Sequence, residues 1–341
     1  MKTYSRFKTL FAGILLLASI ALAQPPRGES VQPSSDEASK LQEARGKLKG
    51  FIVWSTSRNG NHDLYRMDPD GTDVKPLTKG PKTDWYPRIS PDGKRILFTR
   101  SKLDWSSEDD ANKFELWDTW VVGADGQGEK LLIPNSTWAI WTRDGKSIVF
   151  ARGKKVFKAA VDGSGETVIA DGDKDLKGGL TQEPALSDNG KLLALTLRGS
   201  ERETGILNLE TRKWFTSGGG CQFSFFPASY RVIRVNSTGV GGTQIFAFDL
   251  DKDGMHGKIS GDRIGGKSIR FMDLPGRRSH EYFPKLSNDG NYLVWAATQY
   301  GHDHDLADYE IYIWKIDQPL DRAVRLTFHS GNDRWPDAFL E

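Results

Sequence analysis

The sequence predicts an all-β fold, a six-bladed β-propeller whose blades are four-stranded antiparallel sheets. The first observation is composition. The 341 residues include 36 Gly and 15 Pro beside 17 Phe, 11 Trp and 9 Tyr, which is typical of a turn-rich, aromatic-rich β protein rather than a helix bundle. The second is a hairpin motif that recurs at intervals of about 40 to 60 residues, the period of propeller blades. The third is that the start of the repeated region lacks one strand of a blade and its end supplies one, so that together they make a complete blade.

The clearest hairpin occupies residues 84–98 and reads DWYPRISPDGKRILF. Asp-Gly between two short apolar runs is a strong hairpin signal, because both turn residues need positive φ. Related copies read PALSDNG-KLLALTL, PKLSNDG-NYLVWAAT and, less closely, WTRDG-KSIVFAR. The acids and amides of these turns are therefore interpreted as turn formers rather than catalytic groups: Asp92, Asp144, Asp188, Asn189 and Asp289.

Each copy continues into a second hairpin, so one unit predicts four strands. The units lie near residues 84–133, 136–170, 181–217, 221–274 and 281–328. Residues 51–78 supply only three strands, and residues 332–340 share the Asp-x-x-Pro of the inner strands. We therefore expect the C-terminal strand to join the N-terminal blade and close the ring, which removes exposed sheet edges.

Residues 1–23 have the pattern of a secretory signal peptide. A basic start is followed by an apolar run, LFAGILLLASIAL, and by Ala21-Leu22-Ala23 as a cleavage site. The run is short for a membrane span and no Cys follows it, so we expect a periplasmic or secreted protein with no membrane span and no lipid anchor. Residues 24–49 are predicted to be a polar leader or linker in which Ser34 and Glu37 cap one short helix. The propeller is assigned to residues 50–341.

Charge and cysteine content exclude several classes. A net charge of +2 gives no electrostatic basis for nucleic-acid binding. The single cysteine, Cys221, excludes an intramolecular disulfide and a Cys-based zinc cluster, and we expect it to be buried and unreactive.

The pattern D-x-x-P-x-x-S-P-D-G-K-x-I-x-F, followed by Leu-Tyr, Asp-Gly and Leu-Thr, resembles the propeller repeats of TolB-like periplasmic proteins. The resemblance covers residues 50–341 and implies a propeller that binds partners in the cell envelope. TolB itself carries an α/β domain before its propeller, and residues 24–49 are too few to hold one.

The loops that join the second strand to the third, and the fourth to the next blade, should share one face of the disc. Five histidines map to that face: His62, His280, His302, His304 and His329. Aligning the inner strands predicts a ring of residues at the channel mouth on this face, formed by Asp84, Ser136, Thr181, Cys221, Glu281 and Asp333. A divalent metal is one hypothesis, with ligands His280, His302, His304, His329 and Glu281. The competing interpretation is that these are solvated loop residues and acids that cap strand starts.

No complete catalytic motif is present, so no catalytic residue and no cofactor beyond that metal is assigned. The first functional hypothesis is a non-enzymatic propeller in an envelope assembly that binds a protein or glycan partner over the long-loop face, through Trp105, Tyr300, His62 and Arg334. The alternative is a metal-assisted lyase or hydrolase of acidic polysaccharide, which would resemble oligogalacturonate lyases. A purely structural subunit of a larger assembly is a third possibility, and the oligomeric state stays open.

Overall fold

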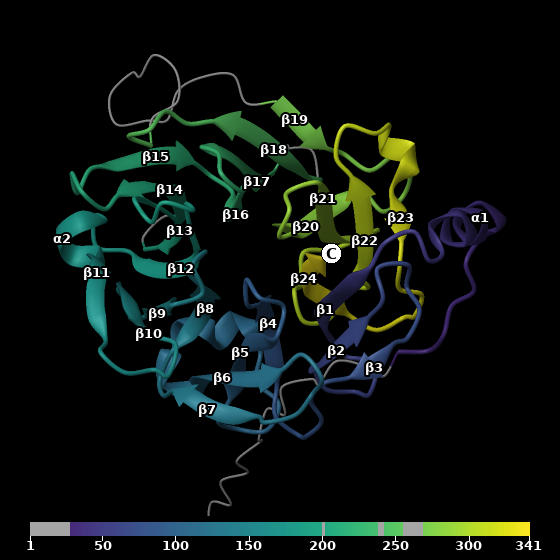
Figure 1. The fold of residues 1–341 in the computed structure, drawn as a ribbon, viewed down its shortest axis with the longest axis horizontal. Helices are drawn as coiled ribbons and strands as arrows, with labels where there is room; N and C mark the ends of the chain where they lie inside the picture. The colour runs from purple at the N-terminus through teal and green to yellow at the C-terminus, as the bar shows by residue number, and fades with distance from the viewer. Residues whose placement is uncertain (1–27, 200–201, 238–241, 255–268) are drawn as a thin grey trace, which may run out of the picture.

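The computed structural model describes residues 28–199, 202–237, 242–254 and 269–341. Its strands form small sheets arranged around a central axis, so the prediction of an all-β propeller is confirmed (Figure 1). The signal peptide predicted over residues 1–23 lies outside the described residues. Within the described ranges, no helix has the length and apolarity needed to cross a membrane.

Among the described residues, four sheets each contain four strands in antiparallel order. The predicted repeat units match them to within a few residues, because the Asp-Gly turns fix where each hairpin begins. In spatial order the strands of these sheets are β24 (Asp333–Leu340), β1 (Gly50–Thr56), β2 (Asp63–Met67) and β3 (Lys75–Pro76); β4 (Asp84–Ile89), β5 (Arg95–Ser101), β6 (Trp117–Gly123) and β7 (Lys130–Ile133); β8 (Thr137–Trp141), β9 (Ser147–Arg152), β10 (Lys155–Ala160) and β11 (Thr167–Asp171); β12 (Leu180–Leu186), β13 (Leu192–Arg198), β14 (Arg202–Asn208) and β15 (Trp214–Gly218).

The other eight strands that the structure describes form one sheet, so four of the six predicted separate four-stranded sheets are observed. The connection between the two halves is a single parallel pair, Thr243 with His280, which joins β18 to the first strand of the second half. The first half holds β16 (Cys221–Phe225), β17 (Arg231–Ser237), β18 (Thr243–Asp249) and β19 (Ile269–Met272), and the second holds β20 (His280–Leu286), β21 (Tyr292–Thr298), β22 (Glu310–Lys315) and β23 (Val324–Arg325).

The predicted closure of the ring is confirmed. Strand β24 pairs antiparallel with β1 from Gly50 opposite Leu340 to Thr56 opposite Asp333. The two ends of the repeated region therefore share one sheet. The hairpin of β1 and β2 lies in its middle, with β24 on one side and β3 on the other, so that neither strand of the hairpin is an open edge.

The predicted Asp-Gly and Asn-Gly turns are present, but the expectation that both turn residues have positive φ is wrong: the glycine has it and the preceding Asp or Asn does not. In the 90–94 turn the Asp92 carboxylate accepts from the Ser90 hydroxyl and the Lys94 backbone N–H, and Gly93 has φ +69°. Corresponding bonds hold the turns of three other blades, through Asp144, Asn189 and Asp289. These side chains are occupied in turn formation, which supports a structural rather than catalytic role.

The segment before the propeller is docked on it. Helix α1 (Ser35–Ala44) begins with the predicted capping box between Ser34 and Glu37. Glu37 also pairs with Arg325 of β23 at 3.2 Å, and Leu41 packs against the main core cluster. The other helical segments are α2 (Gly172–Asp175) and the 3₁₀ turns η1 (Glu108–Asn112), η2 (Phe114–Leu116) and η3 (Leu320–Arg322).

The channel is lined by strands β4, β8, β12, β16, β20 and β24, each packed against the next around the ring. Each carries a residue with positive φ at an irregularity in its pairing with the neighbouring strand. β-Bulges of this kind bend a strand and re-aim its side chains. The six residues are Tyr86, Trp138, Glu183, Gln222, Phe283 and Trp335, with φ between 51° and 60°.

Candidate functional site

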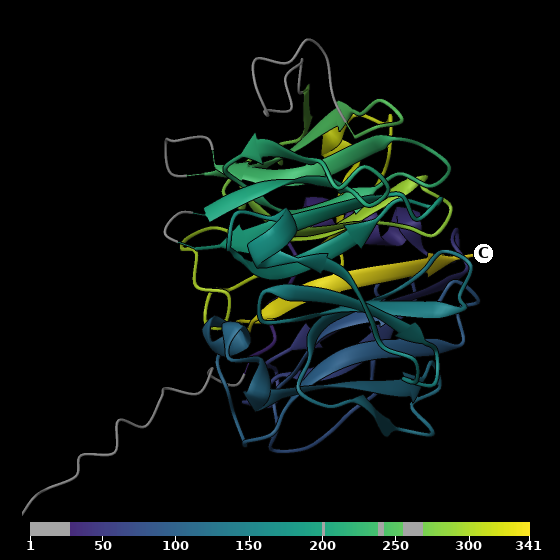
Figure 2. The ribbon, with the colours of Figure 1, turned by 90° about the vertical axis from the view of Figure 1, so that its left-hand side faces the viewer.

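Two long loops dominate one face of the disc, which we call the long-loop face. One is residues 102–116, which contains η1 and η2, and the other is residues 299–309. The short hairpin turns and the C-terminus lie on the opposite side, the turn face (Figure 2). The two long loops come from sheets on either side of β24 and meet beside the channel.

Arg334 of β24 holds the two loops together. Its side chain is fully buried, and Nη1 lies 2.6 Å from Asp305 Oδ1 and 3.1 Å from Glu108 Oε2. The same nitrogen donates to the His304 carbonyl oxygen at 2.8 Å. One guanidinium therefore fixes both loops to the inner strand of the closing blade.

Further bonds complete this buried network. Glu108 Oε2 accepts from Trp335 Nε1 at 2.8 Å, and the Asp305 carboxylate accepts from the Glu108 backbone N–H. Burial opposes ionisation of Asp305, but Arg334 and the hydrogen bonds from the Ser107 hydroxyl and the Glu108 backbone N–H together hold the pKa of Asp305 below its ordinary value. Burial, reinforced by Arg334, lowers the pKa of His62 to about 3, so His62 is neutral. The network is a rigid scaffold under the loops.

Beneath the network the channel is filled by aromatic rings. Trp138 lies 5.0 Å from Tyr86 and 5.3 Å from Trp335 between ring centroids, and Phe283 lies 4.3 Å from Trp335. These rings come from four different inner strands. Their mutual contacts form one aromatic cluster around the part of the channel next to β24.

The four predicted partner-contacting residues differ in exposure. Tyr300 is 76% exposed and stands on the 299–309 loop as predicted, while Trp105 is half-buried. His62 and Arg334 were placed wrongly, because both are fully buried under the loops and cannot touch a macromolecule. They act within the scaffold instead. Glu108, which unites the network, carries no sequence signal that separates it from other loop acids.

The five predicted metal ligands do not share one site. His302 and His304 lie 5.0 Å apart between ring centroids, and His304 Nδ1 is 3.1 Å from Glu108 Oε1. His329 Nε2 is 2.8 Å from Asp333 Oδ2 in a separate pair, and Glu281 accepts from the Leu274 backbone N–H. His280 begins strand β20. Across the described part of the chain, no group of three or more His, Cys, Asp or Glu residues is arranged to hold a metal ion.

The prediction of which residue of each inner strand faces the channel is also wrong. The members of the predicted ring are buried against neighbouring strands: Asp84, for example, pairs with Arg100 of β5 at 2.6 Å, and Ser136 bonds to Thr119. The bulge that follows changes which side chains reach the axis. The channel-facing ring is the positive-φ set that begins with Tyr86, two residues after Asp84.

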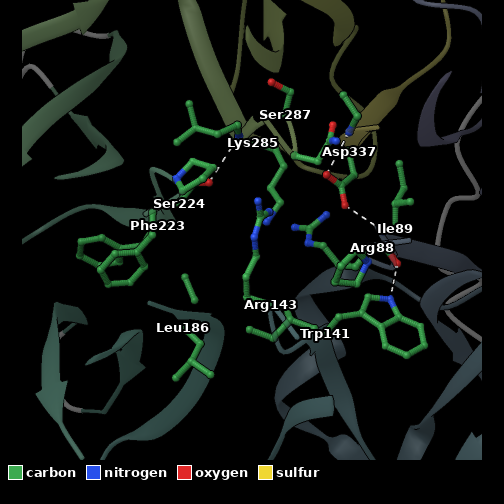
Figure 3. A pocket seen from close by; sticks show the side chains of 18 of the residues that line it. Arg88, Ile89, Trp141, Arg143, Leu186, Phe223, Ser224, Lys285, Ser287 and Asp337 are labelled. Carbon is green, nitrogen blue, oxygen red and sulfur yellow. Dashed lines mark hydrogen bonds between the residues drawn. The ribbon is translucent and has the colours of Figure 1, made fainter. Parts of the chain in front are cut away.

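The turn-face mouth opens into a cavity of about 150 Å³. Tyr86 and Trp335 line it, as do Arg88 and Lys285, which lie two residues after the positive-φ positions of β4 and β20. Figure 3 shows Arg88, Lys285 and Arg143 of the β8–β9 turn directed toward one another beside Asp337. This cavity is the second candidate site.

The fold and its repeats define a TolB-like β-propeller, and comparisons with known proteins agree. No family profile matches the chain. The Tol-Pal system protein TolB of Geobacter sulfurreducens is 33% identical over 63 residues, which is 18% of this chain and 15% of that protein. The structure of a TolB candidate from Agrobacterium tumefaciens superposes with a TM-score of 0.55 at 14% identity, over 84% of this chain and 92% of that one.

The same fold also occurs in a protein with a different description. Hydrazine synthase of Kuenenia stuttgartiensis matches with a TM-score of 0.59 at 13% identity, over 89% of this chain and 48% of that chain. The stretch matched to the Geobacter protein is less than a fifth of that protein's length. At these identities the likeness shows the fold alone.

Proposed function

We propose that this chain is an exported, non-enzymatic TolB-like propeller that binds a protein partner over its long-loop face. The observation that carries the proposal is where apolar side chains are exposed. Among the described residues, the two most exposed large hydrophobic side chains are Tyr300 (76%) and Leu103 (57%), and both stand on the long loops, as does Leu306 (42%). The other five, each 41–48% exposed, lie elsewhere along the chain. Aromatic and aliphatic side chains on a rigid support are typical anchors of protein interfaces.

The support under these side chains favours binding over catalysis. Arg334, Glu108 and Asp305 are occupied by one another and by backbone groups, so the loops are held in place rather than poised for chemistry. A preformed loop surface lowers the ordering cost of binding. Two exposed leucines and an exposed tyrosine on these loops suit a protein surface better than a glycan, for which polar groups would be needed.

We further propose that the propeller has six blades. The eight-stranded sheet is held together by the single Thr243–His280 pair, and its two halves each have one channel-lining strand with a positive-φ residue. Gln222 and Phe283 occupy this position in the two halves. The repeated inner-strand geometry supports counting them as separate blades.

Export is proposed from the N-terminal sequence pattern. Cleavage after Ala23 would leave Gln24 as the first residue of a periplasmic or secreted protein. N-terminal sequencing of the protein recovered from the periplasm or medium should give Gln24. Recovery only in the cytoplasm with Met1 retained would contradict export.

Partner binding is tested by affinity capture from the host envelope with Tyr300→Ser and Leu306→Ser variants. We expect both to lose most of the captured protein, because each removes exposed apolar area from the long-loop face. The matched control is Leu131→Ser, which removes a leucine of 46% exposure from β7, away from these loops. Equal capture by all variants would contradict the proposed face, and capture released by free glycan would assign a glycan partner instead.

A further inference from the structure

The cavity at the turn-face mouth brings three cationic side chains together from separate sheets. Arg88 comes from β4, Arg143 from the β8–β9 turn and Lys285 from β20 (Figure 3). Arg88 is buried, and Lys285 is half-buried. Like charges at close quarters destabilise each other unless an anion lies among them.

The protein supplies few anionic partners to these cations. Within the described residues, neither Arg88 nor Lys285 has a carboxylate oxygen within 4.0 Å, and Arg143 has only Asp188 at 3.8 Å on the rim. Arg88 Nη1 donates to the Pro87 carbonyl oxygen, and its guanidinium lies 3.7 Å from the centroid of the Tyr86 ring. Most of the donors on these three side chains therefore remain available to a ligand.

The carboxylates that line the same cavity are already bonded. Asp337 accepts from the backbone N–H groups of Ile89 and Ala338. Glu183 accepts from the Thr196 hydroxyl and the Gln222 backbone N–H. Asp188 accepts from the Ala228 backbone N–H. Acids and bases line the cavity in equal number, but the acids already accept hydrogen bonds from the fold, whereas the bases keep most of their donors free.

We propose that the turn-face mouth of the channel binds a small oxyanion, a carboxylate or phosphate group, held by Lys285, Arg143 and Arg88. Arg presents paired N–H donors that match either oxyanion, and Lys adds a point charge. Burial lowers the pKa of Lys285, Asp337 opposes this, and Arg88 and Arg143 lower it further. A bound anion would offset that repulsion. The site is independent of partner binding, since it opens on the opposite face.

The proposal is tested by isothermal titration calorimetry of the mature protein with two probes, inorganic phosphate and succinate, in low-salt buffer without other oxyanions. Binding of at least one probe at concentrations up to about 10 mM is expected. Binding of phosphate alone would assign a phosphate ligand, and binding of succinate alone would assign a carboxylate ligand. Binding of both would show that the site accepts oxyanions of either shape. Absence of binding by either probe would overturn the proposal.

Variants locate the bound anion. Arg143→Gln and Lys285→Gln should each weaken binding about tenfold or more, because each removes one charge-assisted contact. Lys146→Gln, exposed on the same turn as Arg143, is the control and should bind as the unmodified protein does. Asp188→Asn should tighten binding, since it frees Arg143 from its rim carboxylate. Circular dichroism confirms folding of each variant, and equal affinity in all four would place the anion elsewhere and overturn the proposal.

Discussion

Arg334 Nη1 and Asp305 Oδ1 lie 2.6 Å apart in the buried layer beneath the long-loop face. This contact connects the closing strand β24 to the 299–309 loop, and Glu108 extends it to the 102–116 loop. The pair links two features of the molecule. The strand that completes the ring also supports the surface proposed to bind the partner.

Removing the guanidinium should therefore destabilise the protein strongly. Arg334→Leu leaves the carboxylates of Asp305 and Glu108 buried without their cation, which costs about 3–5 kcal/mol. Chemical denaturation followed by tryptophan fluorescence measures this loss. Arg322→Leu removes an exposed pair with Glu43 and should change stability by less than about 1 kcal/mol. Equal effects in the two variants would show that the buried network does not support the fold.

The buried carboxyl group of Glu281 should make the stability of the folded protein depend on pH. Burial raises the pKa of Glu281 to about 8, against the hydrogen bond from the Leu274 backbone N–H. The folded protein then retains a proton that the unfolded chain releases, so stability contributed by this group is present at low pH and declines as pH rises toward 8. Glu281→Gln should remove this decline, worth up to about 5 kcal/mol between pH 4 and 9. Parallel stability profiles for the variant and the unmodified protein would contradict the assignment.

The His329–Asp333 pair should also make the stability of the folded protein decline as pH rises, in this case through a basic group. Burial alone would lower the pKa of His329, but Asp333 2.8 Å away raises it overall. The stabilisation that protonated His329 contributes is fully present below the pKa of histidine in the unfolded chain. It declines as the pH rises through the pKa of His329 in the folded protein. Asp333→Asn should thus cost more stability near pH 5 than at about pH 8, measured by thermal unfolding. A loss that is the same at both pH values would indicate that only the hydrogen bond to Trp54 matters.

Cys221 should be unreactive in the native protein. It is buried, and burial followed by the nearby Glu183 charge raises the pKa of its thiol to about 12. The thiolate is the reactive form, so a disulfide reagent should detect no thiol in native protein and one after denaturation. Fast labelling of folded protein would contradict this burial.

The sequence was informative where chemistry is local and repeated. Asp-Gly turns need glycine at positive φ, so motifs such as Asp92-Gly93 located the hairpins, and Asp-x-x-Pro near residue 333 located the closing strand. The Ser34–Glu37 capping box is likewise a local signal. These interactions span a few residues, and spacing alone reveals them.

The site was harder to predict because it depends on side-chain direction. A bulge after Asp84 makes Tyr86 the residue that faces the channel. Aligning the repeats by sequence could not show this, because the bulge is a change in the backbone angle φ. Arg334 and His62 are polar residues near loops, which suggests exposure, but the folded loops cover them. Burial of a charged group depends on partners distant in sequence, such as Asp305 and Glu108.

Site-specific photo-crosslinking in intact host cells shows whether a protein binds over the long-loop face. A photoreactive phenylalanine analogue placed at Tyr300 should form a covalent adduct with one partner protein, while the same analogue at Leu131 should not. Absence of an adduct from Tyr300, with or without one from Leu131, would contradict binding over this face.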